Sequence, residues 1–288
     1  MTSTHEALPD TRVHKHIAAK ARPFDLKLKE VWRYRDLIWL FTRKDFVITY
    51  KQTILGPLWL FLRPFITSIM YMFVFGGIAG ISTDGVPKIL YYLFSYSAWS
   101  LFAECVTSCA ETFTANAAVL GKVYFPRLVM PVSAVLSAFL RFLIEMLLSL
   151  AFFVYYLAKG EITTDPALWG LIPAALLMMA LLGFGCGIIA SALTTKYRDL
   201  SILIKFGVQL WMYATPVVYP LSAVSGRMRT VLMLNPVTAP MEMMRLGLWG
   251  QGTVSVPRVM VSLAISVLIA LGGILLFNRV ERTFTDTV

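Results

Sequence analysis

Charged residues, histidine and cysteine are all scarce in this chain of 288 residues. Aspartate, glutamate, lysine and arginine make up only 15% of it, whereas a soluble domain averages roughly 25%. Hydrophobic residues make up 58%, against roughly 45–50% in soluble proteins. This composition excludes an ordinary soluble protein and predicts an integral membrane protein.

The scarce histidines and cysteines limit the chemistry that the apolar part can perform. All three histidines lie in the N-terminal tail, so none is placed inside the membrane to bind a metal or relay protons. All three cysteines lie inside apolar segments, where small buried side chains are expected rather than a disulfide or a metal site. No Ser-His-Asp arrangement or other catalytic cluster is visible, so we expect no catalytic, cofactor-binding or metal-binding residues.

Two further signals are missing from the sequence. No GxxxxGK[ST] phosphate loop occurs, so the chain cannot hold ATP in the Walker manner. No short apolar core with a small-residue cleavage site precedes the first long apolar run, so we expect no cleaved signal peptide. These absences favour a membrane subunit that is not itself an enzyme.

What the chain does contain is six long apolar runs, and about 20 such residues cross a bilayer as a helix. We expect spans at residues 58–79, 89–113, 128–157, 168–193, 201–218 and 259–277. Prolines and glycines interrupt the apolar segment at residues 220–256, which leaves no stretch comfortably long enough to span. That segment is predicted to form two short re-entrant helices on the external side. A seventh span is the alternative, and it would move the C-terminus outside.

Residues 26–52, ahead of the first span, combine aromatic with basic side chains. One helical face carries Val31, Tyr34, Ile38 and Phe41. Such a pattern is typical of an amphipathic helix lying in the membrane interface. The alternative is a soluble amphipathic helix docked on its own protein.

Positive charge predicts the orientation of the chain. Lysine and arginine concentrate in residues 1–56, and cytoplasmic segments carry the excess of these residues. Arg227, Arg229 and Arg245 count as external charges that dilute this signal without reversing it. The predicted fold class is an all-α polytopic membrane protein, with six spans in residues 53–277 and both termini cytoplasmic. Residues 1–25 are expected to form a disordered cytoplasmic tail, and residues 278–288 a short one.

Polar residues recur at helical spacing in the second and third spans. They are Ser97, Ser100 and Glu104 in the second, and Ser137, Arg141 and Glu145 in the third. A charge at the bilayer centre costs about 2.5–3.5 kcal/mol, so these groups are expected to face protein or water. Arg141 and Glu145 lie one turn apart and can pair, and Glu104 is a second candidate partner of Arg141. The two stripes either hold the helices together or line a polar path.

Aromatic residues near the outer ends of the spans also have two interpretations. The set comprises Tyr92, Tyr96, Trp99, Tyr213, Tyr219 and Trp249. Aromatic side chains at this depth usually anchor a protein in the membrane interface, and the alternative is that they stack against sugar rings. A GxxxG pair in the fourth span, Gly183 and Gly187, favours close helix packing.

The loop between the second and third spans, residues 116–131, has an unusual composition. It contains two prolines, a Gly-Lys pair, an arginine and a Tyr-Phe pair directly before Pro126. A loop that only reverses the chain needs none of these features. Because the charge distribution places it in the cytoplasm, we interpret it as an element on which another protein pushes.

Five motifs in this order resemble the membrane subunit of bacterial ABC exporters of lipid-linked polysaccharides such as O-antigen and capsule. They are KDFVITYKQTILGPLW, NAAVLGKVYFPRLVMPVS, KYRDL, QLWMYATPVVYP and LNPVTAPMEMMR. The resemblance covers roughly residues 26–277 and identifies the chain as similar to type-two ABC permeases of the polysaccharide and polyol-phosphate export families. The motifs do not identify the glycan.

The resemblance implies a homodimer joined to two copies of a separate ABC ATPase, which would hold the ATP and magnesium. It also implies a coupling loop at residues 113–127 and a second cytoplasmic contact at residues 196–199. The residues carried over to ATPase coupling are Asn116, Lys122, Tyr124, Phe125, Pro126, Arg127, Lys196, Tyr197, Arg198 and Asp199.

The function predicted from all of this is export of a lipid-linked polysaccharide across the bacterial cytoplasmic membrane, driven by the partner ATPase. Two alternatives remain within the same type of permease, namely export of teichoic acid and export of drugs or small lipids. An ion-coupled secondary transporter is an alternative of another class, with Glu104, Arg141 and Glu145 as its relay. A membrane-embedded transferase would need a catalytic constellation that the sequence lacks.

Overall fold

The computed structural model describes residues 28–51, 54–116, 123, 125–197 and 199–285. Within these ranges the chain forms helices joined by turns and short irregular segments, and no strand occurs. The prediction of an all-α protein is therefore confirmed. Lys122, Tyr124 and Arg198, three residues predicted to contact an ATPase, lie outside the described residues.

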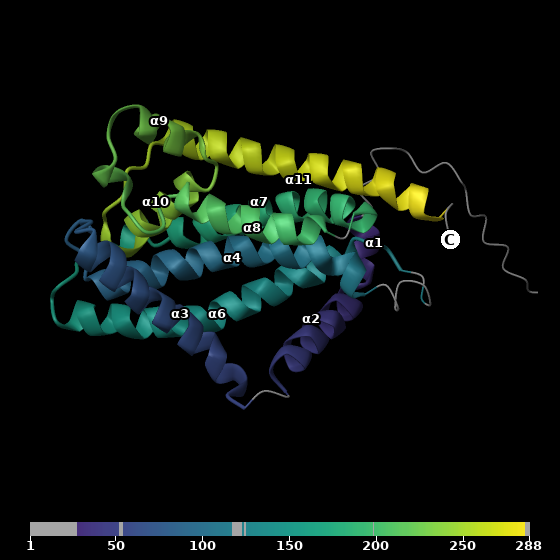
Figure 1. The fold of residues 1–288 in the computed structure, drawn as a ribbon, viewed down its shortest axis with the longest axis horizontal. Helices are drawn as coiled ribbons and strands as arrows, with labels where there is room; N and C mark the ends of the chain where they lie inside the picture. The colour runs from purple at the N-terminus through teal and green to yellow at the C-terminus, as the bar shows by residue number, and fades with distance from the viewer. Residues whose placement is uncertain (1–27, 52–53, 117–122, 124, 198, 286–288) are drawn as a thin grey trace, which may run out of the picture.

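The long helices form one bundle, in which most run side by side along the longest axis of the molecule and α3 (Trp59–Tyr71) is inclined to the others (Figure 1). They are α3 with its π-helical continuation (Met72–Ile78), α4 (Lys88–Ala115), α6 (Val129–Ala158), α7 (Leu171–Lys196), α8 (Leu200–Tyr213) and α11 (Val256–Thr285). Each corresponds to one of the six apolar runs. The helix α6 has 30 residues, which at about 1.5 Å per residue gives about 45 Å.

Four helical segments of the described chain are long and apolar enough to cross a membrane. They are Gly56–Ile78, Val129–Ala158, Pro166–Thr195 and Val256–Arg279. The helix α4 has 28 residues but carries charged residues, and α8 is apolar but has only 14 residues. The predicted second and fifth spans are thus present as helices, while the number of spans that cross the membrane stays a prediction.

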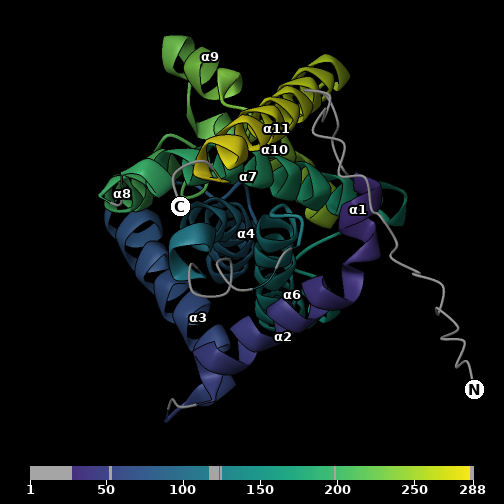
Figure 2. The same ribbon diagram turned by 90° about the vertical axis from the view of Figure 1, so that its right-hand side faces the viewer.

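The predicted N-terminal amphipathic segment forms two helices, α1 (Leu28–Arg33) and α2 (Arg35–Tyr50). They lie at the end of the bundle where α4 ends and α6 begins (Figures 1 and 2). The inner face of the pair, which includes Val31 and Ile38, packs with Phe125 and Leu128. The outer face exposes Trp32 and Trp39.

The proline- and glycine-rich segment lies at the opposite end of the bundle (Figure 1). It forms two short helices, α9 (Gly226–Leu234) and α10 (Thr238–Trp249), as predicted, after a single 3-10 turn (Leu221–Ala223). Most of α10 is buried against α7, whereas α9 is largely exposed. Of the two short helices, α10 therefore packs more extensively against the bundle than α9 does.

Close helix packing around α7 fixes the centre of the bundle, where α7 lies between α4 and α11 (Figure 2). A Cβ built on Gly183 would lie 2.6 Å from the Cβ of Cys105, and one on Gly187 would lie 2.6 Å from the Cβ of Cys109. On the other side, a Cβ on Gly185 would lie 2.7 Å from the backbone of Ala270. No side chain fits at these contacts, so the expected packing role of the GxxxG pair is confirmed.

Candidate functional site

A cavity of about 420 Å³ lies between α2, α3, α4 and α6. We call it the charged cavity because it is lined by both carboxylates and guanidinium groups. Its lining consists of Asp45, Thr49, Tyr50, Trp59, Leu60, Arg63, Glu104, Ser108, Arg141 and Glu145. Three of the six residues predicted to line a polar path are among them.

Arg141 of α6 connects three helices at this cavity. Its Nη2 lies 3.0 Å from Oε1 of Glu104 on α4, and its Nη1 donates to Oδ2 of Asp45 on α2 at 3.1 Å. Charge-assisted hydrogen bonds of this kind are roughly twice as strong as neutral ones. The Arg141–Glu104 contact confirms the expectation that the two stripes meet. The contact with Asp45 was not predicted, because it depends on how α2 folds back over the bundle.

Glu145 makes a different contact from the one expected. The structure pairs Arg141 with Glu104 and Asp45, while Oε2 of Glu145 accepts a hydrogen bond from Ser100 at 2.7 Å. Ser97 faces Ser149 across the same helix pair, with 3.5 Å between the hydroxyl oxygens. The polar stripes therefore divide: Ser97 and Ser100 join α4 to α6, while Glu104, Arg141 and Glu145 border open space.

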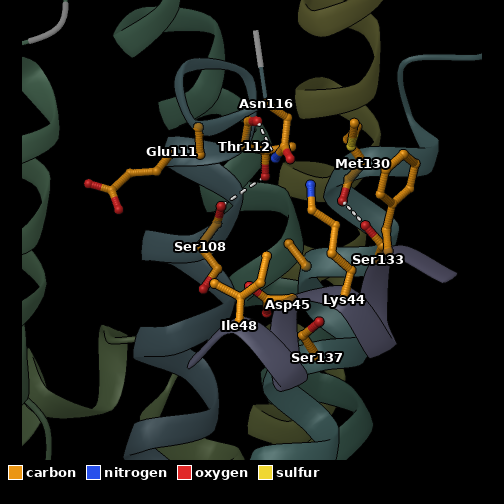
Figure 3. A pocket seen from close by; sticks show the side chains of 13 residues that line it. Lys44, Asp45, Ile48, Ser108, Glu111, Thr112, Asn116, Met130, Ser133 and Ser137 are labelled. Carbon is orange, nitrogen blue, oxygen red and sulfur yellow. Dashed lines mark hydrogen bonds between the residues drawn. The ribbon is translucent and has the colours of Figure 1, made fainter. Parts of the chain in front are cut away.

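A second cavity, of about 330 Å³, lies nearer the end of α4, between α2, α4 and α6 (Figure 3). We call it the hydroxyl cavity because Ser108, Thr112, Ser133 and Ser137 all line it. In Figure 3 the Lys44 side chain extends from α2 toward Thr112 and Asn116, while Glu111 points away.

The two cavities share Asp45 and Ser108 in their linings. Together they form a polar region beneath α2. Ser137, the remaining member of the predicted path, belongs to the hydroxyl cavity. Whether these cavities carry a transported molecule stays a prediction.

The loop predicted to contact an ATPase packs in part against α2. Phe125 is buried, and its ring centroid lies 5.7 Å from that of Phe41 on α2. The amide of Asn116 donates to the carbonyl oxygen of Thr112 at 3.0 Å and so closes the end of α4. Pro126 and Arg127 form the turn that leads into α6, because the amides of Val129 and Met130 donate to their carbonyl oxygens at 3.0 and 3.1 Å.

The second predicted contact lies between α7 and α8, at the same end of the bundle (Figure 1). Tyr197 and Asp199 are exposed there. Lys196 ends α7, and its side chain lies outside the described residues. The two predicted contact segments thus share one end of the molecule with α1 and α2, and their role in ATPase binding stays a prediction.

The six predicted aromatic residues occupy three different environments. Tyr92, Trp99 and Trp249 are buried, with at most 4% of each exposed, and their rings contact those of Tyr91, Phe102 and Phe94. Tyr96 and Tyr219 are partly exposed, and Tyr213 is exposed. The first three pack within the core, which leaves little of their ring faces for a ligand. Sugar stacking by this set stays a prediction.

The burial of Arg245 was not predicted, because this residue was counted only as one of the external charges. Its side chain is buried in α10, where its Nη1 donates to Oε1 of Glu242 at 2.8 Å. Its guanidinium lies over the ring of Tyr91, with 4.5 Å to the centroid, and its Nη2 donates to Oγ of Ser95 at 3.0 Å. A signal existed in the sequence, since opposite charges three residues apart in an apolar helix form a self-contained pair.

A helical bundle with four segments in the described chain that are long and apolar enough to cross a membrane is typical of a multi-pass membrane protein. The chain belongs to the ABC-2 type transporter family, whose sequence profile matches residues 36–249. It is accordingly a protein of the bacterial inner membrane, in a family of transport membrane subunits.

Similar proteins include an O-antigen export system permease protein RfbA of Klebsiella pneumoniae, which is 27% identical over 252 residues. That match covers 87% of this chain and 94% of the relative. An O-antigen export system permease protein RfbA of Myxococcus xanthus is 25% identical over 264 residues, which cover 91% of this chain and 98% of the relative.

Proposed function

We propose that this protein is the permease subunit of an ATP-driven exporter that moves lipid-linked O-antigen glycan across the inner membrane. The observation that carries the proposal is the nearly full-length match to two O-antigen export permeases from different organisms, 94% and 98% of which are covered. The family match over residues 36–249 agrees with a transport subunit. The polar cavities beneath α2 are the features of the bundle that suit a hydroxyl-rich cargo.

The proposed topology has six spans, with α4 and α8 as the second and fifth, and both termini in the cytoplasm. The exposed Trp32 and Trp39 on the basic helix pair α1 and α2 support a position in the inner membrane interface. The helices α9 and α10 then lie on the external side, where they close the path as gate helices.

The proposed assembly is a homodimer of this chain with two copies of an ABC ATPase. The ATPase would bind the ATP and magnesium, because this chain has no phosphate loop. Closure of the ATPase pair would push on the segment around Pro126 and Arg127. Three contacts offer a route for that push into α2 and the cavities. They are the Phe41–Phe125 ring contact and the ion pairs of Arg141 with Asp45 and with Glu104.

The proposal is tested by deleting the gene in its host and measuring long-chain glycan at the cell surface by gel electrophoresis and glycan labelling. The wild-type chain should restore the glycan only together with a functional ATPase partner. Intact surface glycan in the deletion strain would contradict the proposal. Transport that continues without ATP while the ion gradient is intact would point instead to a secondary transporter.

The coupling part of the proposal has its own test. Arg127→Glu or Lys122→Glu should reduce co-purification of the ATPase, because each reverses a charge on the proposed contact segment. Arg227→Glu, the same charge reversal in α9 at the other end of the bundle, is the matched control and should leave the complex intact. An unchanged complex for both Arg127→Glu and Lys122→Glu would remove this segment from the coupling contact.

A further inference from the structure

One wall of the charged cavity is an indole. Trp59, the first residue of α3, lines the cavity and is 48% exposed. Aromatic side chains combine a large apolar face with a rigid shape. A sugar ring presents C–H groups on one face and hydroxyls around its rim, so an aromatic wall beside polar groups is the arrangement that matches it.

Two planar polar side chains in the cavity, Arg63 and Glu145, have hydrogen-bonding capacity left for the hydroxyls of such a ring. Arg63 of α3 lines the cavity, and no hydrogen bond or salt bridge joins its guanidinium to another described residue. Glu145 is bonded through Oε2 to Ser100, and no described residue donates to its Oε1. A guanidinium offers donors only and a carboxylate accepts only, so together they satisfy neighbouring hydroxyls, each of which both donates and accepts.

The charge balance of the cavity argues against an anionic ligand. Its lining holds two cations, Arg63 and Arg141, and three carboxylates, on Asp45, Glu104 and Glu145. Arg141 already binds Glu104 and Asp45. A phosphate would therefore meet no net positive charge, whereas a neutral polyol needs none. The volume of about 420 Å³ falls in the range of about 300–1,000 Å³ that is usual for small-molecule sites.

Other exposed tryptophans provide a comparison within the same chain. Trp32 and Trp39, on α1 and α2, are more exposed than Trp59 but line neither of the two cavities. They have the character of interfacial anchors, for which no polar partners are needed. Trp59 differs because its indole stands beside an arginine and carboxylates.

We propose that the charged cavity is a carbohydrate subsite in which one neutral sugar ring lies against Trp59 and is hydrogen-bonded by Arg63 and Glu145. This inference rests on the proposed function, because the sugar would belong to the exported glycan. It places recognition of the cargo in the permease itself, beneath α2.

The binding test uses the full chain in lipid nanodiscs and saturation-transfer NMR with methyl glycosides of mannose, galactose, glucose, rhamnose and N-acetylglucosamine. At least one glycoside should receive saturation from the wild-type protein. Trp59→Ala should weaken that binding by about tenfold, equivalent to about 1.4 kcal/mol, while Trp59→Phe should retain most of it. Arg63→Gln and Glu145→Gln should each weaken it too, and the matched control Trp39→Ala should bind like the wild type.

Several outcomes would overturn the subsite. They are the absence of saturation for every glycoside, equal binding by Trp59→Ala and wild type, and selective binding of inorganic pyrophosphate that Arg63→Gln abolishes. Size-exclusion profiles of the variants show whether each has folded. If Trp59→Ala does not fold, Arg63→Gln and Glu145→Gln decide, because unchanged binding by both would overturn the subsite.

Measuring surface glycan in the complemented deletion strain distinguishes a failure of the proposed function from a failure of the sugar subsite. If the wild-type chain fails to restore the glycan, the proposed function fails. If it restores the glycan and Trp59→Ala does so equally well, only the subsite fails.

Discussion

Two arginines form ion pairs inside the helical bundle, Arg141 in the middle part of α6 and Arg245 in the short helix α10. The side chain of Arg245 is 3% exposed and that of its partner Glu242 is 4% exposed. The side chain of Arg141 is 10% exposed, but its partners Glu104 and Asp45 are 34% and 51% exposed. One cluster is sealed, and the other borders a cavity.

This difference in exposure predicts a structural role for the Arg245 cluster and leaves the Arg141 cluster accessible to water or a ligand. Removing one partner of a sealed ion pair leaves an uncompensated buried charge, which is strongly destabilising. The Arg245 cluster therefore fixes α10 to α4 through Ser95 and to the chain at Pro216, whose carbonyl oxygen accepts from Arg245. Around Arg141, by contrast, water or a ligand can replace a partner at modest cost. We therefore expect the Arg245 cluster to matter for stability and the Arg141 cluster to matter more for transport.

The largest effect is expected from Arg245→Ala. It leaves Glu242 buried without its cation, and we expect a loss of about 3–5 kcal/mol in the free energy of unfolding. The check is the yield of folded protein and the midpoint of thermal unfolding in detergent. Arg227→Ala, which removes an exposed arginine from α9, is the control. A midpoint like that of the wild type would show that the sealed cluster is dispensable.

An intermediate effect on stability, with a large one on transport, is expected from Arg141→Gln. Glutamine keeps some hydrogen bonding but loses the charge that binds Glu104 and Asp45, and we expect a loss of stability of about 1–3 kcal/mol. Surface glycan should fall by at least about tenfold while the protein still folds, as size-exclusion chromatography would show. Arg141→Lys should restore only part of the transport, because lysine lacks the planar fork that reaches two carboxylates. Destabilisation as large as that of Arg245→Ala would erase the distinction between the clusters.

The smallest effect is expected from Asp45→Asn. Asp45 is half exposed, so its pair with Arg141 should contribute at most about 1 kcal/mol, and salt should screen it. The unfolding midpoint should therefore shift slightly in low salt and hardly at all in high salt. The shift caused by Arg245→Ala should be the same in both. A salt-independent effect of Asp45→Asn would mean that the open cluster is more enclosed than its exposure indicates.

The helices of the bundle were predictable because each is a long apolar run bounded by turn residues. The meeting of Glu104 with Arg141 was also predictable, since two neighbouring antiparallel helices carry polar stripes at the same spacing. These inferences need only local periodicity and the connection of consecutive helices. They do not require knowledge of how distant segments fold together.

The rest of the site depends on contacts between segments that local patterns do not relate. Asp45 and Trp59 reach the cavity only because α2 and α3 diverge from each other while both flank α4 and α6 (Figure 1). Arg245 is buried because α10 folds back into the bundle against α7, whereas charge counting treats the whole segment as external. In both cases the decisive contact joins segments that are distant in the sequence. Local sequence patterns therefore identify the residues but do not predict which residues they contact.

The burial of α4 has a consequence for how the protein is made. This helix lies at the centre of the bundle, yet it is not among the segments of the described chain that are apolar enough to cross a membrane on their own. Its glycine-lined neighbour α7 is synthesised later, and α6 comes between them in the chain. A nascent chain that stops before α7 therefore leaves the face of α4 that carries Cys105 and Cys109 without the glycines that pack against it. We expect α4 to stay close to the insertion machinery until α7 arrives, and truncated chains to be recognised by membrane proteases.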